Sequence, residues 1–302
     1  MKTQAEEVIA TIKHRCSLAR AEKPAYRELY PFLEGLLVIQ VQAKNTLQIH
    51  PPELSPSLVA TKWAEGFPLL RRWEFPLDLQ AAATVLAQIK AFIPESNHPF
   101  QKAHAALARV CDRPQEHQQA IWKSFLEHEW EPWEEWMDTE ELDVSALLFL
   151  ARSCLRPSLE AVAEDLLRKH PLPSSWLKGY CPICGSLPAL LFLQGEGERM
   201  AYCSWCGTTW GLHRLQCPHC DNRYHESLGY FEVEGEPHYR VHYCRLCKKY
   251  FKLIDTRERL DFPYLPLEEW TTLHLDLLAQ QDGWQMPASP SPAVYAEPPQ
   301  EE

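Results

Sequence analysis

The sequence lacks an apolar run long enough to cross a membrane. Its longest uninterrupted apolar stretch is Ala146–Ala151, whereas a membrane-spanning helix requires about 18–20 such residues. The first residues, MKTQAEEVIATIKHRC, also lack the apolar segment and small-residue cleavage site of a secretory signal peptide. We therefore expect a cytoplasmic protein whose hydrophobic residues, 45% of the chain, form a folded core.

The sequence also lacks an excess of positive charge. Its 30 lysines and arginines are outnumbered by 41 aspartates and glutamates, which gives a formal net charge of −11. Nucleic acids and anionic membranes both favour a basic protein surface. The composition therefore argues against these two classes of partner and leaves protein partners open.

Several enzyme signatures are missing as well. We find no glycine-rich loop of the kind that binds phosphate, no nucleophile elbow and no HExxH zinc motif. We therefore expect a protein that is not an enzyme and has no catalytic residues.

Cysteines are the most informative residues that the sequence does contain. Eight of the eleven occur as Cys-x-x-Cys pairs, which in a reducing compartment indicate metal ligation rather than disulfides. Two intervening residues allow one tight turn to direct both sulfurs at a single ion. The candidate ligands are Cys181, Cys184, Cys203, Cys206, Cys217, Cys220, Cys244 and Cys247.

An internal repeat predicts how these pairs combine. Each unit consists of a cysteine pair, a hairpin with a glycine turn, a second pair preceded by tyrosine (Tyr202 or Tyr243), and a strand. This order assigns Cys181, Cys184, Cys203 and Cys206 to site 1, and Cys217, Cys220, Cys244 and Cys247 to site 2. A nested pairing of the four Cys-x-x-Cys pairs is the alternative.

Four thiolates complete the coordination of each ion and leave no position for water or substrate, so we expect the sites to stabilise the fold. Iron in such a site could also carry one electron, as in rubredoxin. We therefore predict two tetrathiolate ions, iron or zinc. Histidines between the pairs are weaker candidates: His213, His219, His225, His238 and His242. The isolated Cys16, Cys111 and Cys154 are expected to be small buried residues, with reactive thiols as the alternative.

The predicted fold class is α+β, with a helical bundle followed by two ribbons. The predicted parts are a helical domain at 1–177, four-cysteine ribbons at 178–215 and 216–262, a C-terminal helix at 263–283, and a disordered tail at 284–302. Three- and four-residue apolar spacing predicts helices over Leu77–Ile93, over Glu268–Gln281 and from about Pro157 to Arg168. His170–Gly179 is the expected linker. Trp130–Trp136, acidic and aromatic, is expected to pack on the bundle, with partner docking as the alternative.

Both the cysteine strings and their flanking segments resemble the formate dehydrogenase accessory protein family FdhE. The strings are CPICGSLP (181–188), CSWCGTTW (203–210), CPHC (217–220) and CRLC followed by KKYFKLI (248–254). Further similar segments are GFPLL (66–70), LRPSLEAVAEDL (155–166) and LHLDLLAQQDGW (273–284). The family commonly has CSLCxTEWH where this chain has CSWCGTTWG, so Thr209 and Gly211 replace acidic and histidine positions.

The resemblance implies a cytoplasmic maturation factor. Such a factor associates with the catalytic subunit of a formate dehydrogenase, a molybdenum- or tungsten-bis-pterin protein with an iron–sulfur cluster, and a redox role has been proposed. Two other functions remain to be compared with it: a rubredoxin-like electron-transfer module and a zinc-ribbon nucleic-acid-binding protein. The basic cluster Arg245, Lys248, Lys249 and Lys252 favours the last, but a ribbon region loaded with two thiolate-bound ions is not basic.

Overall fold

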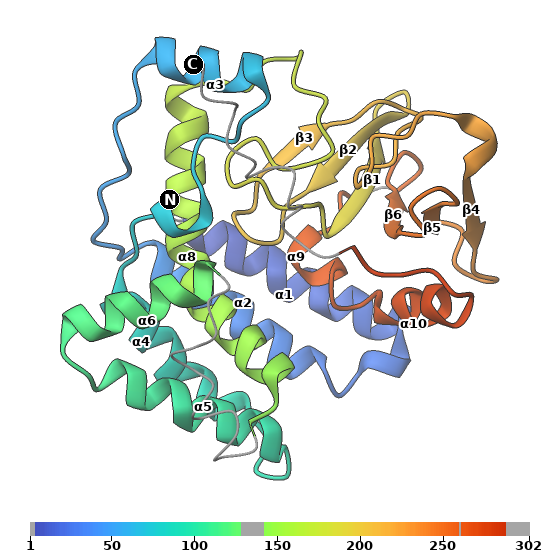
Figure 1. Cartoon of the computed structure of the whole chain (residues 1–302). Coiled ribbons are helices and arrows are strands. Elements are labelled where there is room, and N and C mark those ends of the chain that lie inside the picture. The colour runs from blue at the N-terminus through green and yellow to red at the C-terminus, as the bar shows by residue number, and fades with distance from the viewer. Residues whose placement is uncertain (1–3, 128–141, 260, 288–302) are drawn as a thin grey trace. The chain divides into compact units, whose positions relative to one another are not determined.

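The computed structural model describes residues 4–127, 142–259 and 261–287 (Figure 1). The chain divides into two compact units. The helical unit comprises Met1–Pro52 and Arg72–Val162, and the sheet unit comprises Glu53–Arg71 and Ala163–Glu302. Over the ranges described, no helix is both long and apolar enough to span a membrane. The domain boundaries expected from the sequence, at 177, 215, 262 and 283, remain a prediction about independently folding parts.

Helices form almost all of the helical unit, as predicted. They are α1 (Gln4–Glu22), α2 (Tyr30–Lys44), α4 (Leu79–Ile89), α5 (His98–Cys111), α6 (Gln115–Glu127) and the first part of α8 (Val144–Lys169), with 3-10 turns at Pro24–Tyr26, Arg72–Glu74 and Lys90–Phe92. Leu33, Leu107 and Trp122 are among the fully buried side chains of this unit. Its apolar faces therefore meet in a common core.

Side-chain caps fix where several helices begin. The helix expected over Leu77–Ile93 is present as α4, and the Asp78 carboxylate accepts a 2.9 Å hydrogen bond from the Ala81 amide at its start. Asn97 accepts from the Phe100 amide in the same way at the start of α5. Such caps satisfy amides that have no partner within the helix.

The helix expected to begin near Pro157 begins instead at Val144, so that prediction was wrong. Asp143 caps the observed start by accepting a 2.7 Å hydrogen bond from the Ala146 amide. A proline inside a helix leaves the carbonyl four residues earlier without its usual donor. Here the buried Gln40 side chain of α2 donates to that carbonyl, Ser153 O, at 2.9 Å. This long-range bond offsets the defect at Pro157 and allows α8 to continue.

A single mixed sheet organises the sheet unit (Figure 1). Its strands are β1 (Leu190–Gln194), β2 (Glu198–Tyr202), β3 (Thr209–Gly211), β4 (Leu228–Glu232), β5 (Tyr239–Cys244) and β6 (Tyr250–Asp255), in the order β3-β2-β1-β6-β5-β4. Each repeat contributes a three-stranded antiparallel meander. The two meanders join through parallel pairing of β1 and β6, with Leu191 opposite Leu253. The same unit contains α3 (Pro56–Glu65) and a 3-10 turn at His225–Ser227.

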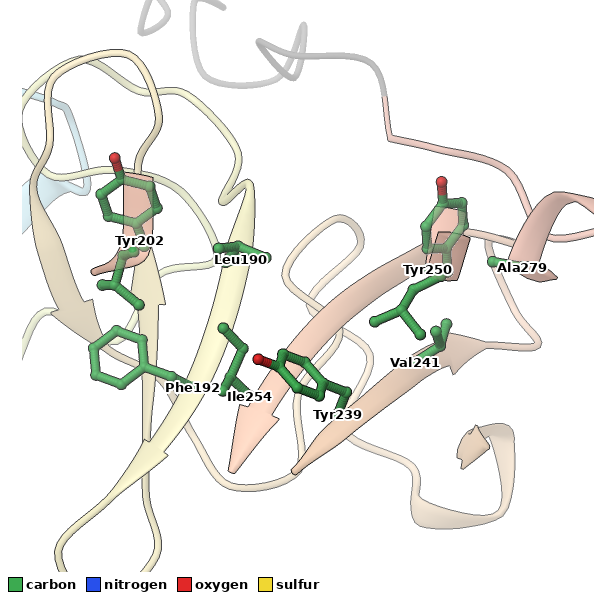
Figure 2. Close-up of a cluster of buried hydrophobic side chains, with 10 residues drawn as sticks. Leu190, Phe192, Tyr202, Tyr239, Val241, Tyr250, Ile254 and Ala279 are labelled. Atoms are coloured by element: carbon green, nitrogen blue, oxygen red, sulfur yellow. The ribbon is translucent and has the colours of Figure 1, made fainter. Parts of the chain in front are cut away.

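The core of the sheet unit includes side chains from both repeats. Figure 2 shows Phe192 and Tyr202 of the first repeat in one cluster with Tyr239 and Ile254 of the second. The short helices α9 (Leu265–Glu268) and α10 (Leu273–Gln281) add apolar side chains, of which Leu275 is fully buried. The two ribbons therefore share one hydrophobic core.

The C-terminal segment differs from the expected single helix over Glu268–Gln281. It forms α9 and α10, separated by a break at which the buried Thr272 hydroxyl donates a 2.6 Å hydrogen bond to Glu268 O. Threonine side chains that bond the backbone compete with helix hydrogen bonds. Trp284, the expected start of a disordered tail, stacks on Tyr243 with ring centroids 4.1 Å apart. The packed chain therefore continues past Trp284. The remainder of that tail from residue 288, and Trp130–Trp136, lie outside the described residues.

The expected linker His170–Gly179 has no helix or strand, yet it is packed into the sheet unit. Trp176 is buried and donates through its indole nitrogen to Tyr180 O at 3.2 Å. Lys178 O accepts a 2.9 Å hydrogen bond from the Trp210 indole. This segment is therefore held against the first ribbon.

Candidate metal centres

All four Cys-x-x-Cys turns have the same backbone. In the first, the Cys181 amide donates to Ser186 O at 2.8 Å and the Gly185 amide donates to Cys181 O at 2.9 Å. The corresponding pairs of bonds recur at the turns that begin at Cys203, Cys217 and Cys244. The residue after each second cysteine has a positive φ; these residues are Gly185, Gly207, Asp221 and Lys248. Glycine adopts this conformation without strain, so the first ribbon has the less strained turns.

The turns bring the cysteines together in the two groups that the repeat predicts. Within each group of four, all sulfurs lie within 4.8 Å of one another. Site 1 contains Cys181, Cys184, Cys203 and Cys206, and site 2 contains Cys217, Cys220, Cys244 and Cys247. The nested pairing is not the one observed.

The spacing of the sulfurs suits a tetrahedral ion. With a metal–sulfur distance of about 2.3 Å, the edge of such a tetrahedron is about 3.8 Å. In site 1, Sγ–Sγ distances are 3.6 Å for Cys181–Cys206 and 3.5 Å for Cys184–Cys203. In site 2, they are 3.6 Å for Cys217–Cys247 and 3.8 Å for Cys220–Cys244. All eight are free thiols. Both groups could therefore hold a metal ion.

The two sites differ in their access to solvent. All four cysteines of site 1 are buried, with at most 2% of any residue exposed. In site 2, Cys220 is exposed and Cys247 is half-buried. Large exposed apolar side chains also occur in this region, among them Tyr230 and Leu246 of the second repeat and Leu215 directly before it. Site 1 is enclosed by the fold, whereas site 2 opens on the surface.

Polar side chains contact the sulfurs at one recurring position, two residues after the second cysteine of a turn. The hydroxyls of Ser186 and Thr208 lie 3.2 Å from the sulfurs of Cys184 and Cys206. Asn222 donates to Cys244 Sγ at 3.4 Å in site 2. These three residues were not predicted from the sequence, although they occupy the same position when the four turns of the repeat are aligned.

Electrostatics favours a bound cation in site 1. Burial raises the pKa of Cys181 and of Cys206 well above the usual thiol range, and contacts with the neighbouring thiols raise that of Cys181 further. Four thiolates cannot coexist in such surroundings without a positive charge, and a divalent ion supplies it. In site 2, burial of Cys244 is outweighed by the amides of Cys247 and Leu246 and by Asn222, which lower its pKa to about 7.

The donor chemistry fits zinc and iron equally. Thiolate ligands in a tetrahedral arrangement suit both metals, and neither site has a water or substrate position among its four sulfurs. The metal that each site binds therefore depends on metal supply and on features other than the sulfur–sulfur distances.

Outside the two sites, the other candidates are not assembled into metal centres. In the ranges described, neither group of possible metal ligands includes a histidine. Burial lowers the pKa of His219, and burial together with Arg199 and Arg240 lowers the pKa of His242 to about 3. Cys16 and Cys154 are buried as expected, and burial raises the pKa of Cys16 to about 12. Cys111 is half-buried, and burial raises its pKa to about 11.

Fold and sites together define an α+β protein with a helical region and two tetracysteine ribbon units. No family model matches the sequence. Among curated proteins, it is similar to the FdhE homolog of Aquifex aeolicus, 36% identical over 143 residues, which cover 46% of this chain and 49% of that protein. It is also similar to the FdhE homolog of Pectobacterium carotovorum, 24% identical over 264 residues, which cover 86% of this chain and 79% of that protein.

A solved structure extends the similarity to almost the whole chain. The crystal structure of the FdhE protein from Pseudomonas aeruginosa superposes with a TM-score of 0.66, covering 97% of this chain and 98% of that chain at 19% identity. At this identity the match establishes the fold. The resemblance to the FdhE family that the sequence predicts is confirmed by these comparisons, and the match spans about half the length of the Aquifex relative.

Proposed function

We propose that this protein is an accessory factor that binds the catalytic subunit of a formate dehydrogenase and supports its assembly or activation. One observation carries the proposal: two tetracysteine sites of tetrahedral spacing occur in a chain with the FdhE fold along almost its full length. The similarity to curated FdhE homologs supports the same proposal. The client and the cytoplasmic location are part of the proposal.

In this proposal the eight cysteines are metal ligands. Zinc would supply structural cross-links, and iron would additionally supply a one-electron couple. Within the chain, the thiolates would hold the ion, Asn222 donates a hydrogen bond to one sulfur, and the hydroxyls of Ser186 and Thr208 lie within hydrogen-bond distance of two others. No side chain is assigned a catalytic role, because the four-thiolate sites have no open coordination position.

The acidic composition suits a protein client better than a nucleic acid. The net charge of −11 would oppose binding to a phosphate backbone. The exposed Leu215, Tyr230 and Leu246 around site 2 provide apolar surface of the kind that protein interfaces use. We therefore assign the client contact to the sheet unit, on the face where site 2 opens.

A pull-down from the native host tests the client assignment. The chain is purified anaerobically with an affinity tag, and co-purified proteins are identified by mass spectrometry against an untagged control. Recovery of a formate dehydrogenase catalytic subunit supports the proposal. Leu246→Glu, on the exposed face, is expected to reduce recovery, whereas Leu277→Glu, on an exposed part of α10, serves as the matched control. A preparation that repeatedly brings down ribosomal or polymerase proteins in place of this subunit contradicts it.

The exposure of Cys220 favours a second candidate function, electron transfer at site 2. Electron transfer falls steeply with distance, so an iron site at the surface can exchange electrons with a partner while a buried one does so more slowly. The purified protein would then be red when oxidised and contain iron. A colourless protein with two zinc ions per chain, isolated anaerobically from the native host, would exclude this role.

A further inference from the structure

We propose that a small cavity beside site 2 binds an apolar group that carries a carboxylate. The cavity has a volume of about 100 Å³ and lies in the sheet unit. Cys217 and Cys244 of site 2 form part of its wall, and Arg199, Arg214, Leu215 and Tyr230 are other lining residues. This volume accommodates several water molecules or an aliphatic group of a few carbons. The proposal does not depend on the proposed function.

Arg199 supplies the polar anchor. This residue of β2 is 94% buried, since only 6% of its surface is exposed. Its Nη1 donates to Gln216 O at 2.6 Å and to His213 O at 3.4 Å. Its Nε is buried and has no hydrogen-bond partner among the residues that the structure describes. Buried donors of charged groups are almost always satisfied, so the guanidinium of this lining residue retains a donor that lacks its acceptor.

The mouth of the cavity adds a second cation and apolar surface. Arg214 is exposed and forms no hydrogen bond or ion pair with the described residues. Leu215 and Tyr230 are 53% and 57% exposed there. Among the residues that line the cavity there is no aspartate or glutamate. Two arginines therefore line a mainly apolar space, and no carboxylate side chain among the lining residues pairs with them.

These features select the ligand class. Guanidinium groups bind carboxylates and phosphates through charge-assisted hydrogen bonds. With a divalent ion bound, the four thiolates of site 2 would leave two negative charges next to the cavity, which would disfavour a dianion such as phosphate. A single carboxylate on a branched aliphatic group satisfies Arg199 and fills the apolar space. A free organic acid and the C-terminal residue of a partner chain both provide this chemistry.

The competing role for Arg199 is that of a countercharge to site 2, since Cys217 lines the same cavity. In that case the arginine would stabilise the loaded site and bind no ligand. The two roles differ in what an Arg199 substitution changes. A countercharge affects the retention of metal alone, whereas an anchor affects the affinity for the carboxylate.

Calorimetric titration of the full zinc-loaded chain with isovalerate and with isovaleramide tests the proposal. Isovalerate is expected to bind at least about tenfold more tightly, because a charge-assisted hydrogen bond is lost in the amide. In amide nuclear magnetic resonance spectra, the shifted signals are expected to be those of the lining residues. Equal affinity for both compounds, undetectable binding of isovalerate, or shifts elsewhere would overturn the proposal.

Two variants and a control sharpen the test. Arg214→Gln is at the surface and is expected to weaken isovalerate binding several-fold with zinc content unchanged. Arg199→Gln is expected to abolish it; if this variant does not fold, Arg214→Gln decides. Arg257→Gln is the control, because Arg257 pairs with Asp255 and does not line the cavity. Unchanged isovalerate affinity in a folded Arg199→Gln variant that loses zinc more readily overturns the proposal in favour of the countercharge.

Peptides then distinguish the source of the ligand. The tripeptide acetyl-Gly-Gly-Leu is compared as the free acid and as the C-terminal amide. Tighter binding of the peptide acid than of isovalerate assigns the cavity to a chain terminus of a partner protein. Tighter binding of isovalerate assigns it to a free organic acid, and both results support the shared chemistry.

Discussion

Substitution of Gly179 by alanine is expected to destabilise the sheet unit severely. A Cβ at this position would lie 2.0 Å from Pro218 O and 2.6 Å from Pro218 Cα. Gly179 lies two residues before Cys181, where the first cysteine turn begins, and Pro218 lies within the third turn, so the two backbones touch where the ribbons meet. Because contacts shorter than 3.0 Å essentially never occur for real Cβ atoms, one backbone must move by about 1 Å.

The surrounding hydrogen bonds set the magnitude. Leu177 O accepts from the Gln216 side chain at 3.0 Å, and Lys178 O accepts from the Trp210 indole at 2.9 Å. A shift of about 1 Å disrupts both bonds, at about 1 kcal/mol each, and overpacking adds about 1–3 kcal/mol. The expected loss in the free energy of unfolding is therefore about 3–5 kcal/mol.

Urea unfolding of the zinc-loaded protein, followed by tryptophan fluorescence, measures this loss. Gly211→Ala is the matched control, because its Cβ would meet only a Leu177 methyl group at 3.6 Å, an ordinary contact. We expect the control to lose less than about 1 kcal/mol. If Gly179→Ala unfolds at the same urea concentration as the control, the close approach of the two ribbons does not determine stability and the reasoning is refuted.

Three further predictions concern the metal sites and the helical unit. A chelator is expected to remove metal from site 2 before site 1, because Cys220 is exposed and Cys184 is buried. The release rates are measured on single-site proteins: Cys184→Ser retains site 2, and Cys220→Ser retains site 1. Faster release from site 1 than from site 2 would contradict this prediction. Gln40→Leu is expected to lower the free energy of unfolding by about 1–3 kcal/mol, because the carbonyl freed by the proline inside α8 loses its donor, whereas Gln42→Leu, at an exposed position, should have little effect. Burial raises the pKa of Glu160, but its ion pairs with Arg156 and Lys44 outweigh this and hold the pKa below its ordinary value of 4.5. The stabilising contribution of Glu160 is therefore complete above that value and is lost as the pH falls below it. Acid unfolding of Glu160→Gln should show a weaker pH dependence in this window, and an unchanged profile would argue against the ion pairs.

The metal-binding candidates were predictable because their chemistry is local. Two residues between cysteines determine a turn, and the repeat determines which turns share a site, so Cys181 to Cys247 could be grouped without knowledge of the fold. The parallel pairing of β1 with β6 is different. It joins Leu191 to Leu253 across the repeat boundary, and no spacing in the sequence encodes which strands of two similar meanders become neighbours.

The errors in the helices have a common physical cause. Pro157 predicts a helix start from local rules, and only the long-range donation from Gln40 allows α8 to pass through it. Thr272 likewise breaks the expected C-terminal helix through its bond to Glu268 O. A side-chain hydrogen bond to the backbone thus overrides the proline signal in α8 and the apolar periodicity at Thr272.

Site 1 is buried and site 2 is partly exposed, so we expect the two metal sites to have different roles. The strands of both repeats form one sheet with one core, and Gly179 holds the first turn against Pro218 of the third. Site 1 lies fully inside this arrangement, so its ion would contribute chiefly to folding. Site 2 is fixed by the same contacts but opens beside the cavity lined by Arg199 and Arg214. A ligand or partner at that cavity would therefore meet a metal site already positioned by the fold, and its binding would alter the access of solvent to site 2 while leaving site 1 unchanged.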